Sequence, residues 1–315
     1  MKYNFFIIGL GQIGGSLALA LKKSKIAKKI YGLDCQFKKS YARILDQYLD
    51  DLETGVSQSE IIILSTPVRE IQNLIKRIAP MMTEKQIMLD TGSTKSEIVK
   101  EMKIFPDRLL IAGHPMTGTV RKEKEAWHPD LFSDRPFFLC FPHRFSRKGK
   151  SVLKDILGRI GAIPFEIDPD RHDFLAANTS HLPYVISLIL LKSFLDFRLQ
   201  DKGIDRFIAT GFLGATRLAL TAPPVATDIL LTNKNYLLLS IKKVLKELTK
   251  FSERIEQDNF SEIIREIYLE AEKRRTLYEN ALFYRTPAVG RNCSTPGQIH
   301  HPSSPAGRGH IEEGA

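Results

Sequence analysis

Cysteine is scarce in this sequence. The chain of 315 residues has three, Cys35, Cys140 and Cys293, which are far apart and lack the close spacing of a metal site. An odd number of scattered cysteines argues against a disulfide-stapled domain and favours free thiols in a reducing compartment. We therefore predict a cytoplasmic protein with no metal site.

Long apolar segments are also missing. The first candidate, Phe5 to Leu21, is interrupted by four glycines and ends in two lysines, without the small-residue site at which a secretion signal is cleaved. The second, Leu182 to Leu191, is shorter than a bilayer requires and is closed by Lys192. We expect no membrane segment.

The positive charge shows no concentrated pattern. The net charge is +10, but the lysines occur as dispersed pairs, and no basic run is interleaved with aromatic residues as in a nucleic-acid groove. The sequence therefore predicts solvated helix faces and no nucleic-acid partner. An anionic small substrate stays compatible with this charge.

Short apolar runs alternate with helical segments over the first half of the chain. The expected strands are 3–8, 30–33, 61–64, 86–89, 109–112, 137–141 and 163–166, with helices over 12–24, near 38–47 and over 147–160. This alternation predicts an α/β fold with a parallel, doubly wound sheet of the Rossmann type.

The pattern changes after residue 168. Apolar residues at helical spacing, such as Leu237, Ile241 and Leu248, predict an all-helical domain over 169–284. Residues 285–315 are rich in proline and glycine and have no apolar periodicity, so we expect a disordered tail there. The predicted domains are therefore 1–168 and 169–284.

A glycine-rich turn follows the first expected strand. Gly9, Gly11 and Gly14 form a GxGxxG series between a strand and a helix, which is the context of a dinucleotide site. In such a site the three glycines permit the turn, the approach of the pyrophosphate and helix packing, respectively. Gln12 and Ile13 open the helix whose N–H groups face the phosphates.

Two further strand ends point to the same cofactor. Asp34 ends the second strand about twenty residues after the turn, where an acid binds the ribose of NAD and repels the 2′-phosphate of NADP. We therefore predict NAD. Ser65, Thr66 and Pro67 end the third strand and are expected to touch the cofactor, although a helix cap followed by proline explains them equally well.

The fourth and fifth strands end in polar residues. Ser93 lies in the segment DTGSTK, where it either meets the substrate or caps the next helix, with Thr94 and Glu97 as a capping box. His114 lies between glycine and proline, and an imidazole there suits proton transfer at neutral pH. A structural histidine is the alternative.

The helical half holds two more candidates, His181 and Arg217. His172 and His181 are nine residues apart, on nearly opposite helix faces, which makes them poor joint metal ligands. A lone histidine in a helical domain is more often structural than catalytic. Arg217 lies among small and apolar residues and needs an anionic partner, either an interhelix carboxylate or a substrate.

Together these segments resemble the prephenate/arogenate dehydrogenase family of tyrosine biosynthesis. The resembling segments are GLGQIGGSLA (9–18), LD (33–34), STP (65–67), DTGSTK (90–95), GHPMTGT (113–119), HD (172–173), SHLP (180–183) and TRLA (216–219). The resemblance covers residues 1–284. It implies a Rossmann domain followed by a helical domain that forms a homodimer.

The resemblance also implies a reaction. NAD⁺ takes hydride from the ring carbon that bears the hydroxyl, the ring carboxylate leaves as CO₂, and the ring becomes aromatic without a metal. By similarity, His114 takes the hydroxyl proton and Ser93 holds the hydroxyl and that histidine. Arg217 binds a carboxylate of the dicarboxylate substrate, and His181 and Thr117 line its pocket.

The sequence departs from the family pattern between residues 212 and 226. Phe212-Leu213-Gly214 replaces the usual Phe-Arg-Asp. After the arginine segment, Ala222-Pro223-Pro224-Val225-Ala226 replaces the usual Asp-Pro followed by Met-Trp, although Asp228-Ile229 remains. Two other interpretations are kept. One is another dehydrogenase of the same two-domain plan, of the β-hydroxyacid or imine type. The other is a nucleotide-binding protein without turnover.

Overall fold

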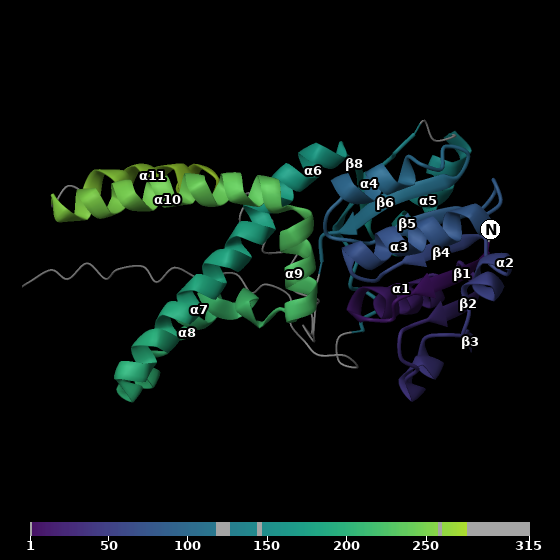
Figure 1. Cartoon of the computed structure of the whole chain (residues 1–315), viewed down its shortest axis with the longest axis horizontal. Coiled ribbons are helices and arrows are strands. Elements are labelled where there is room, and N and C mark those ends of the chain that lie inside the picture. Colours follow the sequence, from purple (N-terminus) through teal and green to yellow (C-terminus); the bar gives the residue numbers. More distant parts are fainter. Residues whose placement is uncertain (1, 118–126, 144–146, 258–259, 276–315) are drawn as a thin grey trace, which may run out of the picture.

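The computed structural model describes residues 2–117, 127–143, 147–257 and 260–275. They form a sheet domain from which a group of helices extends to one side (Figure 1). The tail expected over 285–315, together with Cys293, lies outside the described residues.

The sheet carries the first half of the chain. Its eight strands are ordered β3-β2-β1-β4-β5-β6-β7-β8, and all neighbours pair in parallel except β6 and β7. Their bounds are β1 (Tyr3–Ile8), β2 (Ala27–Leu33), β3 (Gln47–Tyr48), β4 (Ile61–Leu64), β5 (Ile87–Asp90), β6 (Leu109–Pro115), β7 (Pro136–Cys140) and β8 (Ile163–Glu166). Strand order reverses beside β1, and ligands of such sheets bind in the crevice at the carboxyl ends there.

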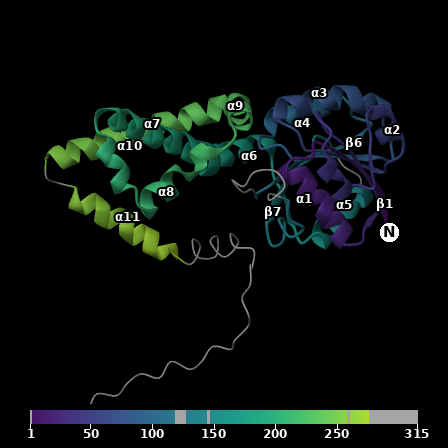
Figure 2. The ribbon, with the colours of Figure 1, turned by 90° about the horizontal axis from the view of Figure 1, so that it is seen from below.

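Helices cover both faces of the sheet and form the whole second half. The α-helices are α1 (Gln12–Lys23), α2 (Leu52–Ser57), α3 (Val68–Ile78), α4 (Ser96–Met102), α5 (Arg147–Arg159), α6 (Pro169–Ala176), α7 (Leu182–Gln200), α8 (Thr210–Thr216), α9 (Pro223–Thr232), α10 (Lys234–Glu256) and α11 (Ser261–Lys273). Shorter turns are the 3-10 helices η1 (Lys39–Arg43), η2 (Ala79–Met81), η5 (Lys202–Phe207) and η6 (Arg217–Leu220), and the π-helical η4 (Ala177–His181). In Figures 1 and 2, α6 and α9 are the helices of the second half nearest the sheet.

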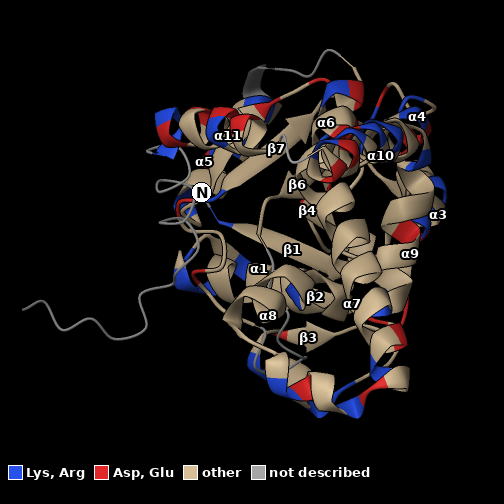
Figure 3. Ribbon diagram, turned by 90° about the vertical axis from the view of Figure 1, so that its left-hand side faces the viewer, with Lys and Arg blue, Asp and Glu red and all other residues tan. Residues whose placement is uncertain are grey.

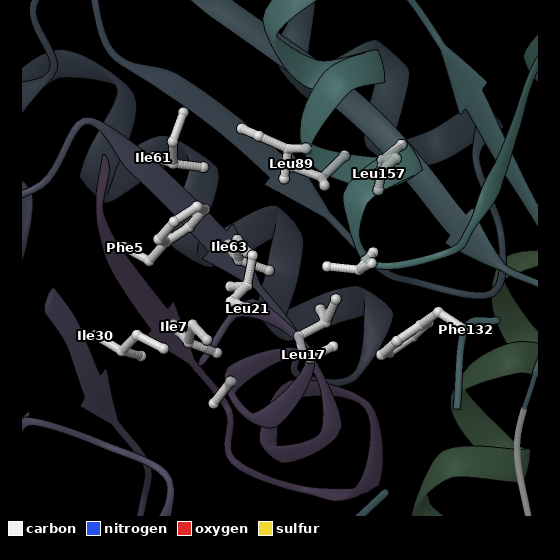
Figure 4. Packing of buried hydrophobic residues seen from close by; sticks show 14 of the residues in the cluster. Phe5, Ile7, Leu17, Leu21, Ile30, Ile61, Ile63, Leu89, Phe132 and Leu157 are labelled. Atoms are coloured by element: carbon white, nitrogen blue, oxygen red, sulfur yellow. The ribbon is translucent and has the colours of Figure 1, made fainter. Parts of the chain in front are cut away.

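The central strands are largely apolar because both of their faces are buried. Phe5 and Ile7 of β1 pack with α1 and α5, and Phe6 and Ile8 pack with α2, α3 and α4 on the opposite face. Figure 4 shows Leu17 and Leu21 of α1 over the first of these faces. This two-sided burial produces the continuous apolar runs that predict a parallel sheet.

The expected strands are all present, but the prediction of a helix near 38–47 is wrong. The segment forms the short turn η1 and then β3, which pairs Gln47 and Tyr48 with Tyr31 and Gly32 of β2. Pairing with an open sheet edge overrides the helical spacing, because strand formation depends on the neighbouring strand.

The apolar segment after residue 181 is longer than expected. Together α6, η4 and α7 form one helix, Pro169–Gln200, which by length and composition alone is long and apolar enough to cross a membrane. Only 22% of its most apolar window is buried. This is weak evidence for a membrane span, since a helix that packs against protein has the same composition. In Figure 3 most of the α7 ribbon carries no charged residues.

Candidate active site

A cleft of about 800 Å³ opens at the carboxyl ends of β1, β2, β4 and β5, and α9 closes one side of it. Most residues predicted to bind the cofactor line this cleft: Gly9, Gly11, Gln12, Ile13, Asp34, Ser65, Thr66 and Pro67. Ser93, predicted to meet the substrate, lies in the same lining. The crevice expected from the strand order is therefore present.

The glycines of the turn allow close packing of the backbone and leave space for a ligand. Gly9 has a φ of +89°, and a Cβ there would lie 2.5 Å from the carbonyl oxygen of Ser65. A Cβ at Gly14, which lies beneath the turn, would come within 1.9 Å of the carbonyl oxygen of Gly9. A Cβ at Gly11 would meet no atom within 4 Å. Gly11 thus leaves open the space that a diphosphate needs.

Polar groups at the cleft also fit a dinucleotide. The Asp34 carboxylate accepts a hydrogen bond from the Leu10 amide at 2.6 Å, which orients it at the end of β2. The Oγ1 of Thr66 is buried and makes no hydrogen bond within the part of the chain that the structure describes. An oriented carboxylate for a ribose and an unpaired hydroxyl match the donors and acceptors of NAD.

His114, near the end of β6, begins a chain of polar contacts that crosses to the helical half. Its Nδ1 lies 2.9 Å from Nε2 of His172 on α6. The Nδ1 of His172 lies 2.8 Å from Oδ1 of Asp173. Sequence analysis gave His172 and Asp173 no role of their own, and only the HD pair within the family resemblance marked them.

These contacts define the tautomers. Ionised Asp173 only accepts, so His172 donates from Nδ1 and keeps an acceptor at Nε2. His114 then donates from Nδ1 and carries its lone pair on Nε2. This nitrogen makes no hydrogen bond with the described residues. His114 therefore presents a proton acceptor.

Electrostatics keep this imidazole neutral. Burial, the neighbouring His172 and the Lys95 ammonium together hold the pKa of His114 well below its usual range. For Asp173, hydrogen bonds from His172 and from the amides of Ser96 and Lys95 outweigh burial and lower the pKa of the carboxyl. His114 is therefore a neutral proton acceptor, and the ionised Asp173 orients it through His172.

Asp173 also caps α4 from the other half of the chain. Its carboxylate accepts from the amides of Lys95 at 2.7 Å and Ser96 at 2.8 Å. The capping box expected from Thr94 and Glu97 is wrong, because α4 begins at Ser96 and the Thr94 hydroxyl donates to Thr232 instead. Asp173 replaces that local cap.

A buried ion pair holds the two strand ends together. Lys95 and Asp90 are both fully buried, and Lys95 Nζ lies 2.6 Å from Asp90 Oδ1. Lys95 also donates to the carbonyl of Gly113, and the Gly113 amide donates to Asp90 at 3.0 Å. Since β5 and β6 are paired neighbours, this network fixes the positions of Ser93 and His114.

His181, in the helical half, is connected to Asp173 through Asn233. It is buried, and its Nδ1 is 3.0 Å from the amide nitrogen of Asn233, which also donates to the carbonyl of Asp173. Burial lowers the pKa of His181 to about 4. A second link between the halves, Arg69 Nε to Asp228 Oδ1 at 2.8 Å, lies at the cleft.

Two other predicted substrate residues are not brought into this cluster. The Thr117 hydroxyl donates to the carbonyl of Leu131 at 3.0 Å. Arg217 begins η6, is exposed and makes no ion pair with the residues described here. The turn η6 is held on α7, where the Ala219 amide donates to the Ser187 hydroxyl at 2.9 Å.

The fold and the cleft define a class of protein: a Rossmann-type dinucleotide-binding protein with a neutral histidine at the sheet edge. Residues 17–163 match the nucleotide-binding domain of prephenate dehydrogenase, and residues 168–268 match its dimerization domain. The chain belongs to the prephenate dehydrogenase family.

Named relatives share most of the chain. The prephenate dehydrogenase of Bacillus subtilis is 29% identical over 84% of this chain and 73% of its own length. The cyclohexadienyl dehydrogenase of Zymomonas mobilis is 29% identical over 85% of this chain and 94% of its own. The structure of Aquifex aeolicus prephenate dehydrogenase with hydroxyphenyl propionate and NAD⁺ has a TM-score of 0.80 at 24% identity, covering 88% of this chain and 98% of that one. This likeness confirms the predicted two-part fold.

Proposed function

We propose that the protein is an NAD-dependent dehydrogenase that oxidatively decarboxylates prephenate to 4-hydroxyphenylpyruvate. The observation that carries the proposal is the chain of contacts from His114 through His172 to Asp173, placed at the sheet edge that also forms the dinucleotide cleft. Family membership and the names of the relatives support the same reaction.

The proposed chemistry needs one base that can return its proton. The glycine turn and Asp34 would hold NAD⁺, which would supply the hydride acceptor. The Nε2 of His114 takes the proton of the substrate hydroxyl, and the imidazolium charge is stabilised through His172 by Asp173. When CO₂ leaves, its bonding electrons aromatise the ring and charge the former hydroxyl oxygen. That oxygen then takes the proton back from His114.

The remaining site residues are assigned by position. We assign Ser93 to the hydroxyl end of the substrate, because it follows β5 beside His114 and lines the cleft. We assign His181 and Thr117 to the wall of the substrate pocket. A neutral His181 donates from Nε2, since its Nδ1 accepts from Asn233.

We propose that Arg217 binds a substrate carboxylate, because a guanidinium pairs with a carboxylate through two hydrogen bonds. Arg217→Lys keeps the charge and loses that geometry, so KM for prephenate should rise about tenfold with kcat within about threefold. Lys202→Ala, also on a short turn of the helical half, is the matched control. An unchanged KM in Arg217→Lys would remove this assignment.

We further propose two domains, an NAD-binding domain over 1–168 and a helical domain over 169–284. We propose that the protein forms a homodimer through the helical domain and acts in the cytoplasm. The match of residues 168–268 to a dimerization domain supports the dimer. Large exposed apolar side chains concentrated between Ile189 and Leu269 support it further. Unpaired Cys35 and Cys140 suit a reducing compartment.

Turnover by the purified protein tests the function. NADH formation is followed with prephenate, arogenate and a short β-hydroxyacid, each with NAD⁺ and with NADP⁺. We expect turnover of prephenate with NAD⁺, and a lower rate with NADP⁺ because Asp34 repels the 2′-phosphate. Preference for the β-hydroxyacid would overturn the proposal, and preference for arogenate would change the side chain of the substrate but not the mechanism.

A further inference from the structure

The only tryptophan of the chain, Trp127, lies against the dinucleotide turn. Its indole Nε1 donates to the carbonyl oxygen of Gly11 at 3.0 Å. The same oxygen accepts the first helical hydrogen bond of α1, from the Gly15 amide at 2.9 Å. The carbonyl of Gly11 is therefore held by two donors.

Gly15 provides the space for this indole. A Cβ at Gly15 would lie 2.2 Å from Nε1 and 2.5 Å from Cδ1 of Trp127. No side chain can share that space with the ring. The glycine at position 15 is therefore required by Trp127, whereas Gly9, Gly11 and Gly14 serve the turn itself.

The residues after Trp127 continue along α1. The His128 amide donates to the buried Ser16 hydroxyl at 3.0 Å, and Lys23 forms an exposed ion pair with Asp130. The segment 127–130 thus runs along the helix, with Trp127 at the N-terminal end. Helix N–H groups face a bound diphosphate at that end.

The indole also reaches the residues that support Asp34. Its ring centroid is 6.0 Å from that of Tyr41, which stacks on Tyr48 at 6.1 Å. The Tyr48 hydroxyl donates to the carbonyl of Asp34 at 2.9 Å. Burial and the nearby Asp34 carboxylate raise the pKa of Tyr41, so its phenol stays protonated.

We propose that Trp127 is a positioning residue for the dinucleotide. Its indole holds the peptide of the turn where the pyrophosphate would bind. Through Tyr41 and Tyr48 it also supports Asp34, whose carboxylate would bind the ribose. A peptide unit is planar, so fixing the Gly11 carbonyl sets the direction of the Gln12 N–H on its other side. That N–H belongs to the first turn of α1, which faces the phosphates. The inference rests on the proposed use of NAD and not on the identity of the substrate.

Calorimetric titration of NAD⁺ into the full chain, without substrate, tests the proposal. Trp127→Phe keeps a ring and removes the donor, so the Kd for NAD⁺ should rise about three- to tenfold, the usual effect of one lost hydrogen bond. Trp127→Ala removes the ring as well and should raise it more than about tenfold. KM for prephenate should stay within about twofold in Trp127→Phe.

Gly15→Ala gives an independent test. Alanine is normally favoured over glycine inside a helix, but here its Cβ displaces the indole. We expect weaker NAD⁺ binding in Gly15→Ala and no further loss when it is added to Trp127→Ala. Asp130→Asn is the matched control, because it removes only the exposed ion pair of the same segment and should leave the Kd within about twofold.

The outcomes separate this inference from the proposed function. If both Trp127 variants bind NAD⁺ as the wild type does and only their Tm changes, Trp127 is merely structural and the inference is overturned. NAD⁺ binding with the expected losses but without turnover of prephenate would overturn the proposed function alone. The emission of this single tryptophan should also change when NAD⁺ is added to the wild type, and an unchanged emission would contradict the inference.

Discussion

The two halves of the chain bury their apolar side chains in different ways. In the sheet domain Phe5, Ile62 and Phe137 are completely buried between helices of the same chain. In the helical half Leu199 is 85% and Phe207 83% exposed. The first half therefore completes its core within one chain, whereas the second presents surface that suits another copy.

The proposed site lies where these halves meet, and the largest effect should come from its proposed base, His114. His114→Asn removes the basic ring nitrogen and keeps a polar side chain, so kcat should fall about a hundredfold or more. The sheet core is untouched, so Tm and the Kd for NAD⁺ should stay close to wild type. Loss of NADH formation in the variant, with unchanged NAD⁺ binding, would support the assignment. Equal rates of NADH formation in variant and wild type would remove it.

The orienting acid should have the next largest effect. In Asp173→Asn an amide nitrogen in the place of Oδ1 donates to His172 and loses the bond from the Lys95 amide, while the remaining oxygen still accepts from the Ser96 amide. The donor order then reverses, and Nε2 of His114 carries a proton in place of the lone pair. We expect kcat to fall about 10- to 100-fold, more than any change in KM for NAD⁺. Asp168→Asn, an exposed cap of α6, is the control and should retain kcat.

The exposed apolar surface can be tested without touching the site. Leu245 and Leu248 of α10 are 58% and 57% exposed. Replacing both by Glu should raise the dissociation constant of the dimer about tenfold or more, because charge replaces apolar area in the contact. Light scattering after size exclusion measures this, with Lys243→Glu as the control on the same helix. An unchanged dimer would move the interface away from α10.

The smallest expected effect is a pH dependence of stability. The folded pKa of His181, about 4, lies below its unfolded value near 6.5, so the unfolded chain binds the proton more tightly. Stability is therefore complete above pH 6.5 and should fall by up to about 1.4 kcal/mol per pH unit between 6.5 and 4. His181→Gln should reduce the slope of the unfolding free energy against pH in that window. A slope equal to wild type would show that other groups carry the dependence.

Local patterns predicted the cofactor half well. The strand, the glycine turn and helix α1 are contiguous, so the positions of Gly9, Gly11 and Gly14 could be read from one segment, and Asp34 from the end of the next strand. The prediction of a helix near 38–47 was wrong for the opposite reason, because the conformation of this segment depends on pairing with the edge of β2. Ser93 and His114 could be expected near one another because the carboxyl ends of parallel strands meet at one edge.

The amino-acid order alone determined that this chain has a parallel sheet, a dinucleotide turn and a histidine at a strand end, since each follows from residues close together in the chain. Folding decided which groups orient that histidine. His172 lies 58 residues from His114, Asp173 caps a helix 77 residues away, and Trp127 reaches back 116 residues to Gly11. Such contacts form only when separate segments pack, and no local pattern records them.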